Sequence, residues 1–288
     1  MTEQSLEQIG FLALESMLFE VSATPKPGLV DRYNNGAHHD MDFFTFMSSE
    51  ASLRHSFDDF AQLGYSHRDE PVKKLLPYLQ QSGQAAEKSM FAGTRGINTH
   101  KGMIFSLGLL SGVAGWLTGK EALKAERLCQ LTAQMCAGLS AQDETALRQK
   151  PPAQLTKGEA MYLKYGVTGA RGEAESGYKT VREISLPLYR KLRGEGCSVN
   201  NALVDILLHL LAYAGDTNIL GRHDLETLTY AQKEAAKVLQ KGSIHTEEGR
   251  QAIIDLDNDF IEKYISPGGC ADLIAVTHFL YEAEKLKD

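Results

Sequence analysis

The sequence of 288 residues is 43 % hydrophobic and 23 % charged, and its 30 Lys and Arg residues against 37 Asp and Glu residues give a formal net charge of −7. These fractions are those of an ordinary globular protein, and the 26 glycines and 8 prolines follow no period, which excludes collagen-like and disordered classes. The negative net charge argues against nucleic acid as a partner, because a face that binds nucleic acid needs many Lys and Arg contacts to phosphates.

The cysteines and the hydropathy pattern indicate the compartment. The four cysteines lie far apart without a CxxC pair, which is typical of a reducing environment. No stretch of about 18 apolar residues occurs. The first residues carry Glu3, Glu7 and Glu15 without a basic segment, so neither a membrane span nor a signal peptide is expected. We therefore expect a cytoplasmic protein with no membrane partner.

Helical periodicity runs along almost the whole chain. Apolar side chains recur at three- and four-residue steps from Leu6 to Met17, and again over residues 43–60 with one polar break. Further amphipathic runs follow at residues 70–90, 100–117, 121–140, 178–192, 199–213, 225–241, 247–264 and 270–285. Strand-like alternation is scarce, and no low-complexity linker divides the chain. The pattern predicts an all-α fold, a single multi-helix bundle over residues 1–288.

Glycines, prolines, charges and histidines concentrate in five connections between the predicted helices. The connections are residues 23–42, 93–102, 166–177, 215–222 and 266–272. Catalytic and binding residues lie on such connections more often than on the outer faces of helices. We expect the five segments to converge on one cleft.

The first connection, residues 23–42, is long for a structureless segment in a compact domain, which favours a functional role. It offers cations, proton carriers and oxygen ligands, namely Lys26, Arg32, His38, Asp40 and Asp42. The alternative is an ordered surface loop in which Asp40 or Asp42 caps the next helix.

The second connection, residues 93–102, leads directly into an apolar helix. Backbone N–H groups at that helix start, together with Lys101, would suit an anion such as a phosphate. Asn98 and His100 add short hydrogen-bonding groups. The alternative is a simple turn in which Thr99 caps the helix.

The third connection carries paired carboxylates. Glu173 and Glu175 lie two residues apart and would share a side if the chain were extended there, which would suit Mg²⁺ or proton transfer. Arg171 could clamp a phosphate or could merely neutralise the two acids.

The last two connections repeat this combination of acids and phosphate binders. Asp216 could hold a metal, Asn218 could donate hydrogen bonds and Arg222 could bind phosphate, although a turn initiated by Asp216 needs no ligand. Gly268 and Gly269 would let backbone amides approach a phosphate, although the same segment is also an ordinary helix start. Asp272, in the first turn of that helix, would either favour the helix dipole or hold a metal.

Six motifs occur in order within these connections: PGLVD at residues 27–31, GAHHDMD at 36–42, NTHKG at 98–102, GARGEAESG at 169–177, GDTN at 215–218 and SPGG at 266–269. Together they resemble the triphosphoribosyl-dephospho-CoA synthase family, which serves citrate lyase and malonate decarboxylase. The resemblance covers residues 20–280 or so, and it rests on the order of six motifs rather than on any single one.

The resemblance implies transfer of the 5-triphosphoribosyl group of ATP to 3′-dephospho-CoA with release of adenine. The product would be the prosthetic-group precursor of the acyl carrier protein of citrate lyase or malonate decarboxylase. Two polyanionic substrates need several cations from different loops, and an oxocarbenium-like transition state is stabilised by carboxylates and a positioned base. The implied reaction inverts the anomeric centre in one displacement.

Within this resemblance the candidate residues take hypothetical roles. The phosphate-binding candidates are Lys26, Arg32, Lys101, Arg171 and Arg222, with Asn98, Asn218, Gly268 and Gly269 as further substrate contacts. The candidate ligands of a Mg²⁺ cofactor on the triphosphate are Asp216, Glu173, Glu175 and Asp42. The candidate bases are His38, Asp40 and Glu175, and the candidate acid for departing adenine is His100.

Two other functions remain open, together with the partners. One is a Mg²⁺-dependent all-α glycohydrolase of ADP-ribose linkages, in which water accepts the ribosyl group. The other is a non-catalytic nucleotide-binding accessory module. For the synthase, a homodimer is possible, and a separate enzyme is expected to transfer the product to the carrier protein.

Overall fold

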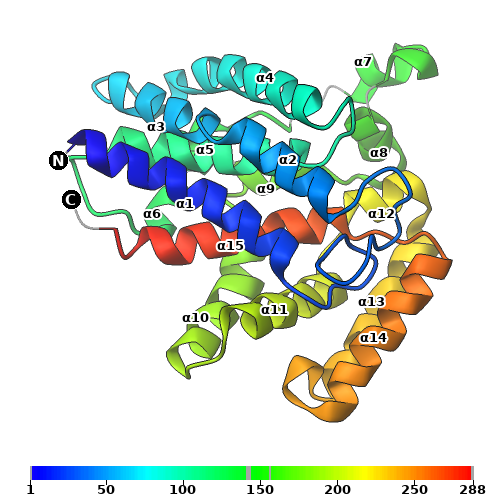
Figure 1. Cartoon of the computed structure of the whole chain (residues 1–288). Coiled ribbons are helices and arrows are strands. Elements are labelled where there is room, and N and C mark those ends of the chain that lie inside the picture. The colour runs from blue at the N-terminus through cyan, green and yellow to red at the C-terminus, as the bar shows by residue number, and fades with distance from the viewer. Residues whose placement is uncertain (1, 141–143, 156, 287–288) are drawn as a thin grey trace.

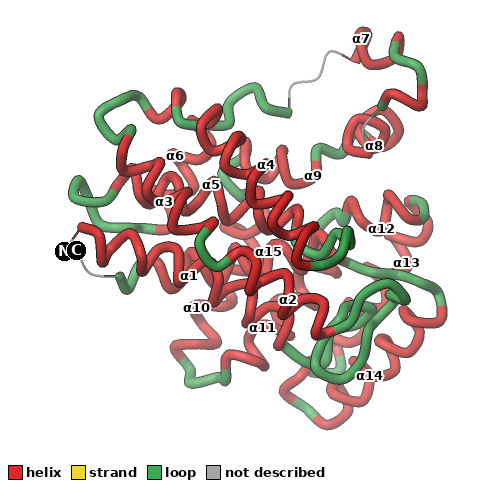
Figure 2. The backbone as a smooth tube through the Cα atoms, turned by 45° about the horizontal axis from the view of Figure 1, so that its top comes forward, coloured by secondary structure: helices red, strands yellow, loops and turns green. Residues whose placement is uncertain are grey.

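The computed structural model describes residues 2–140, 144–155 and 157–286, and within these ranges it contains helices and loops but no strand (Figure 2). The predicted all-α fold is confirmed. The α-helices are α1 Thr2–Ser22, α2 Phe43–Leu53, α3 Ser56–Ser66, α4 Leu76–Gly93, α5 Lys101–Leu117, α6 Ala125–Met135, α7 Glu144–Gln149, α8 Lys157–Tyr165, α9 Gly169–Glu175, α10 Leu186–Gly194, α11 Val199–Tyr213, α12 Thr217–Arg222, α13 Leu225–Gln240, α14 Glu247–Glu262 and α15 Gly268–Ala283.

Short helical turns complete the list. Three are 3₁₀ turns, η1 Val72–Lys74, η2 Pro152–Gln154 and η4 Ser243–His245, and η3 Val181–Ser185 is a π-helical turn that runs into α10. None of the described helices is both long enough and apolar enough to cross a bilayer.

Helices α5, α11 and α15 form the centre of the bundle. They are buried on almost every side, because their sequences are apolar around the whole circumference and not along one stripe. In Figure 1, α15 runs between α1 and the pair α10 and α11, while α13 and α14 pack side by side at one end. The ends of the central helices therefore meet the connections in which the candidate residues lie.

Helices α3 and α5 approach each other at glycines. A Cβ at Gly64 would lie 1.8 Å from the carbonyl oxygen of Gly112, and a Cβ at Gly115 would lie 2.0 Å from that of Ala61. Both obstacles are backbone atoms, which cannot rotate away. The glycines therefore allow the two helices to pack backbone against backbone.

The periodic run over residues 43–60 is divided between two helices, and the division falls at Arg54 and His55, whereas the polar residue of the run, Glu50, lies within α2. Asp42 caps α2 by accepting the backbone N–H of Thr45, and α2 ends at Leu53 before α3 begins at Ser56. Two predicted connections contain short helices, since α9 lies within residues 166–177 and α12 within residues 215–222.

The segment 23–42 has no helix or strand, as expected, and buried acids hold it in place. Asp31 accepts the backbone N–H of Lys26 at 2.9 Å. Asp257 of α14 accepts the backbone N–H of Gly28 at 2.9 Å and the Asn34 side chain at 2.7 Å. These bonds give a long segment one conformation, so that it can contribute a defined wall to a site.

We predict that Gly115→Ala destabilises the protein by about 2–3 kcal/mol, because the new methyl group must push α3 and α5 apart. Urea unfolding followed by the helical circular dichroism signal measures the change. The control is Gly194→Ala at the end of α10, where no atom lies within 4 Å of the added Cβ. Equal effects of the two substitutions would contradict the close packing of α3 on α5.

Candidate active site

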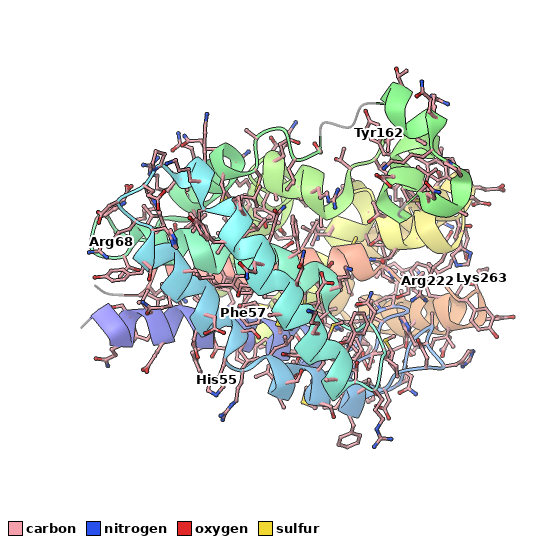
Figure 3. The ribbon with its side chains drawn as sticks, turned by 90° about the horizontal axis from the view of Figure 1, so that it is seen from above. His55, Phe57, Arg68, Tyr162, Arg222 and Lys263 are labelled. Atoms are coloured by element: carbon pink, nitrogen blue, oxygen red, sulfur yellow. The ribbon has the colours of Figure 1, made fainter. Side chains whose placement is uncertain are left out.

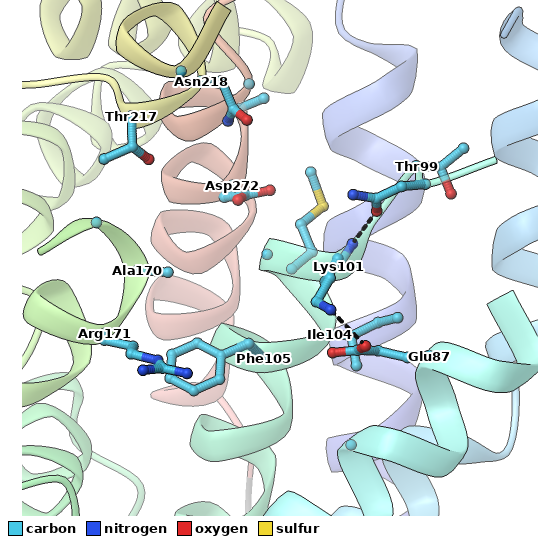
Figure 4. A pocket seen from close by; sticks show the side chains of 18 of the residues that line it. Glu87, Thr99, Lys101, Ile104, Phe105, Ala170, Arg171, Thr217, Asn218 and Asp272 are labelled. Carbon is cyan, nitrogen blue, oxygen red and sulfur yellow. Dashed lines mark hydrogen bonds and ion pairs between the residues drawn. The ribbon is translucent and has the colours of Figure 1, made fainter. Parts of the chain in front are cut away.

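A cavity of about 1230 Å³ lies where the five connections meet. Every one of the five segments contributes to its lining, together with α4, α5 and α8, so the predicted convergence on one cleft is confirmed (Figure 4). The predicted site residues that line it are Lys26, His38, Asp40, Asn98, Lys101, Arg171, Asn218, Arg222 and Gly268. Segments almost 250 residues apart in the chain thus share one hollow.

Other predicted residues lie outside the lining, namely Arg32, Asp42, His100, Glu173, Glu175, Asp216 and Gly269. Arg32 is exposed and donates hydrogen bonds to Thr24 and Asn200. Asp42 is the N-cap of α2. Gly269 packs against the carboxylate of Asp216. These residues therefore support the surrounding structure instead of facing the cavity.

Four cationic side chains line the cavity, and they differ in whether a carboxylate of the protein is paired with them. Lys26 is buried and forms an ion pair with the carboxylate of Glu20, and Lys101 pairs with Glu87 at 2.9 Å (Figure 4). Arg171 and Arg222 make no hydrogen bond or ion pair with any residue that the structure describes.

The two free guanidinium groups come from α9 and α12. Figure 3 shows Arg222 at the end of the molecule opposite Arg68, and Figure 4 shows Arg171 among the residues that line the cavity. Because a guanidinium matches the geometry of phosphate oxygens, these are the groups best prepared to bind a polyphosphate.

The carboxylates predicted as metal ligands are engaged elsewhere. Glu173 and Glu175 do not share a side, because residues 169–175 are helical instead of extended; that expectation is wrong. Glu173 accepts the hydroxyl of Thr180, and Glu175 accepts the backbone N–H groups of Gly138 and Ser140 at 2.6 and 2.9 Å. The hydroxyl of Ser140 also donates to Glu175 and lowers the pKa of that carboxyl.

Asp216 is a fully buried helix cap. Its carboxylate accepts the backbone N–H groups of Asn218 at 2.8 Å, Ile219 at 3.0 Å and Cys270 at 2.8 Å. Burial raises the pKa of this carboxyl, although the three N–H donors act in the opposite direction. In the parts of the chain that the structure describes, no group of three or more His, Cys, Asp and Glu side chains converges as a metal site would require. The predicted ligand set therefore does not fit a protein-held Mg²⁺.

His38 faces the cavity as a neutral side chain. Its Nε2 lies 2.9 Å from Ser266 Oγ, and its Nδ1 lies 3.7 Å from the exposed Asp40. Burial and then the charge of Arg222 lower the pKa of His38, against an opposing effect of Asp40. At neutral pH this imidazole can accept a proton.

His100 lies behind the cavity wall in a buried polar cluster. Its Nδ1 lies 2.8 Å from Ser49 Oγ, which in turn accepts the hydroxyl of the lining residue Thr99. Burial, with a smaller effect of Lys26, lowers the pKa of His100 to about 3. His100 is therefore a neutral imidazole at neutral pH and lies outside the cavity lining, so the structure gives no support to its candidate role as the acid for departing adenine.

Glu50 completes the buried cluster. Its Oε1 lies 3.8 Å from His100 Nε2, and neither carboxylate oxygen has a hydrogen-bond partner among the described residues. Burial and then the charge of Glu20 raise the pKa of Glu50 to about 8, although Lys26 lowers it. At neutral pH Glu50 is a neutral acid beside a neutral histidine.

Comparison of the sequence with known proteins also indicates a nucleotide-binding enzyme. A family model described as ATP:dephospho-CoA triphosphoribosyl transferase (CitG) matches residues 6–288. The chain belongs to this family. It is similar to the 2-(5″-triphosphoribosyl)-3′-dephosphocoenzyme-A synthase of Escherichia fergusonii, with 41 % identity over 273 residues, 94 % of this chain and 89 % of the relative. The synthase of the same name from Klebsiella pneumoniae is 41 % identical over 277 residues, 96 % of this chain and 91 % of the relative. No solved structure matches.

In this member of the transferase family, sequence reasoning missed several lining residues. They are the acids Glu20 and Glu87 and the hydroxyl residues Thr168 and Thr217. Glu20 lies on a helix with ordinary amphipathic spacing, so no local signal marks it. Asp272 was considered for the helix dipole or for a metal, and the structure places it on the lining of the cavity.

We predict that Glu50→Gln reduces the loss of stability at alkaline pH. A raised pKa means that the contribution of the neutral Glu50 carboxyl to stability is complete below its ordinary pKa of 4.5 and is lost as the pH rises through about 8. Between pH 6 and 9 the free energy of unfolding should fall about 2 kcal/mol less in the variant than in the wild type. Urea titrations at both pH values measure this difference.

The control for that measurement is Glu248→Gln, which replaces a carboxylate that is 73 % exposed. It should leave the pH dependence of stability unchanged. If Glu50→Gln and Glu248→Gln both follow the wild-type curve, Glu50 is ionised at neutral pH and the buried cluster is charged.

Proposed function

We propose that the chain transfers the 5-triphosphoribosyl group of ATP to the 2′-hydroxyl of 3′-dephospho-CoA and releases adenine. Family membership over residues 6–288 supports the proposal. The observation that carries it is the meeting of Arg171 and Arg222, unpaired among the described residues, on one cavity of about 1230 Å³. This volume exceeds the roughly 300–1000 Å³ of ordinary small-molecule pockets, as two large nucleotides require.

The proposed reaction exchanges one bond at the anomeric carbon of ATP for another. The glycosidic bond from C1′ to N9 of adenine breaks, and adenine leaves with the bonding electrons and takes up a proton. The acceptor oxygen forms the new bond to C1′ and loses its proton to a base. A single displacement inverts the anomeric centre and needs no covalent intermediate on the protein, so positioning and electrostatic stabilisation are the main tasks of the site.

The triphosphate is assigned to the wall formed by α9 and α12. Arg171 and Arg222 provide two full charges there, and Asn218 and Thr217 provide hydrogen-bonding side chains on the same wall. Lys101 can join them only by leaving Glu87, so we give it a smaller share of the binding energy.

Mg²⁺ belongs to this proposal as a companion of the substrate. The four carboxylates first considered as its ligands are Asp42, Glu173, Glu175 and Asp216, and all four lie outside the cavity lining. Mg²⁺ commonly binds substrate phosphates and retains several waters. We therefore propose that it enters with ATP, and we assign it no ligand among these four residues.

The product is proposed to be the precursor of the prosthetic group of citrate lyase or malonate decarboxylase. The same family resemblance supports a later step in which a different enzyme transfers the product to the acyl carrier protein. A hydrolase would use the same cavity with water as the acceptor, so the identity of the acceptor distinguishes the two activities.

The proposed activity is tested by incubating the protein with ATP, Mg²⁺ and 3′-dephospho-CoA and analysing the mixture by mass spectrometry. We expect free adenine and a coupled triphosphoribosyl product in equal amounts. Release of ADP or AMP instead of adenine would rule out the proposed reaction. Adenine release without need of 3′-dephospho-CoA would identify a hydrolase.

We predict that Arg171→Ala and Arg222→Ala each raise the KM for ATP by at least tenfold, which corresponds to about 1.4 kcal/mol of lost binding. Steady-state kinetics of adenine release measures the effect. Arg32→Ala removes an exposed guanidinium outside the cavity and serves as the matched control with an unchanged KM. A wild-type KM in both cavity variants would mean that the triphosphate binds elsewhere.

A further inference from the structure

Asp272 is a carboxylate of the cavity wall that the protein leaves without a partner. It lies on the second turn of α15, and Figure 4 shows it between Thr217 and Asn218 on one side and Lys101 on the other. No residue within the described ranges donates a hydrogen bond to it or forms an ion pair with it.

A glycine of α5 makes room for this carboxylate. Position 102 at the start of α5 is glycine, and a Cβ there would lie 1.9 Å from Asp272 Oδ2. Any other residue at position 102 would push the Asp272 side chain out of its place. The carboxylate thus packs against the backbone of α5 and lines the cavity without a donor among the described residues, so it can accept a proton from a group that enters the cavity.

The surroundings of Asp272 disfavour its charge. Burial, then the charges of Glu20 and Asp216, raise the pKa of Asp272 well above its ordinary 3.8. The charged groups that face it from neighbouring elements are engaged: Glu20 of α1 with Lys26, Asp216 before α12 with backbone N–H groups, and Lys101 of α5 with Glu87. A carboxylate that is poorly solvated and lacks a donor is a stronger base than one in water.

Other acceptors of the cavity are less available. Glu20 and Glu87 are each paired with a lysine, and the Nε2 of His38 lies 2.9 Å from Ser266 Oγ. Asp40 is 65 % exposed and therefore solvated. Asp272 combines a free acceptor with a half-buried position on the lining.

We propose that Asp272 is the general base that takes the proton of the acceptor hydroxyl. This inference rests on the proposed transferase function. As the acceptor oxygen forms its bond to C1′ of ATP and the bond from C1′ to N9 breaks, the hydroxyl proton moves to Asp272 Oδ and the electron pair of the broken bond leaves with adenine. Deprotonated Asp272 also places negative charge in the cavity in which the oxocarbenium-like centre forms.

The direct test compares the wild type, Asp272→Asn and Asp272→Ala in the adenine-release assay over a range of pH. We expect kcat to fall by roughly 10²–10⁴-fold in both variants with little change in the KM for ATP. The wild-type rate should decline as the pH falls through the pKa of Asp272, and this acid limb should be absent from the variants. Added formate should restore part of the activity of Asp272→Ala. The matched control is Glu282→Gln, an acid on the same helix that pairs with Lys285.

Several results would overturn the inference. A kcat of Asp272→Asn within threefold of the wild-type value would do so. A fall of the rate at alkaline pH that disappears when Asp272 is replaced would also do so, because Asp272 would then act as an acid. Recovery of the variant at high Mg²⁺ or Mn²⁺ would make Asp272 a metal ligand. A wild-type protein that releases no adenine would instead refute the proposed function, so the two failures are distinguishable.

A stability measurement tests Asp272 without any substrate. Because its pKa is raised, the folded state loses stability as Asp272 ionises, whereas Asn stays neutral. Asp272→Asn should therefore raise the melting temperature at pH 8, and by more than it does at pH 5. A lower melting temperature at pH 8 would mean that the carboxylate has a stabilising partner, which contradicts the inference.

Discussion

The site depends on one buried carboxylate, Asp216, which joins two parts of the chain. One oxygen accepts the backbone N–H groups at the start of α12, and the other accepts that of Cys270 in the first turn of α15, 54 residues further along. These bonds satisfy orphan donors at two helix starts at once. They also determine that Arg222 and Asn218 share a wall with Asp272. Without this carboxylate the triphosphate wall and the proposed base would have no defined relation to each other.

A second buried interaction, the ion pair of Lys26 with Glu20, fixes another wall of the cavity. Lys26 is 1 % exposed, and Glu20 of α1 binds it through both its carboxylate and its carbonyl oxygen, the latter at 2.7 Å. Removing either partner would leave an uncompensated buried charge, so the pair ties segment 23–42 to α1. The cations of the cavity therefore have different roles. Lysines that are already neutralised shape the walls, and arginines that are not remain for the substrate.

The sequence predicted the larger features well, because they depend on patterns that local chemistry determines. Apolar periodicity located the long helices, and the concentration of charge in the connections indicated the cleft. The errors concern short elements and pairing. A shared side for Glu173 and Glu175 required an extended chain, and the weak periodicity of seven helical residues in a glycine-rich segment did not exclude it. The burial of His100 could not be predicted, because Phe46, Ser49 and Glu50, which surround it, lie far from it in the sequence.

Asp216 and Asp272 show why the site was harder to predict than the fold. Both lie near the start of a helix, and the sequence gives each of them a structural and a functional interpretation: a turn or a metal ligand for Asp216, a partner of the helix dipole or a metal ligand for Asp272. Asp216, at the cap position, accepts hydrogen bonds from three backbone N–H groups and has no role left in the cavity. Asp272, one turn inside α15, faces the cavity. Only the three-dimensional course of the chain separates a carboxylate that builds the site from one that acts in it.

The central claim is that distant connections form one nucleotide site with its triphosphate end at α9 and α12. The most direct measurement is a crystal structure of the protein with ATP in the absence of the acceptor. The account predicts electron density for the triphosphate within hydrogen-bond distance of both Arg171 and Arg222. A well-ordered triphosphate bound outside this cavity, with both guanidinium groups still free, would contradict it.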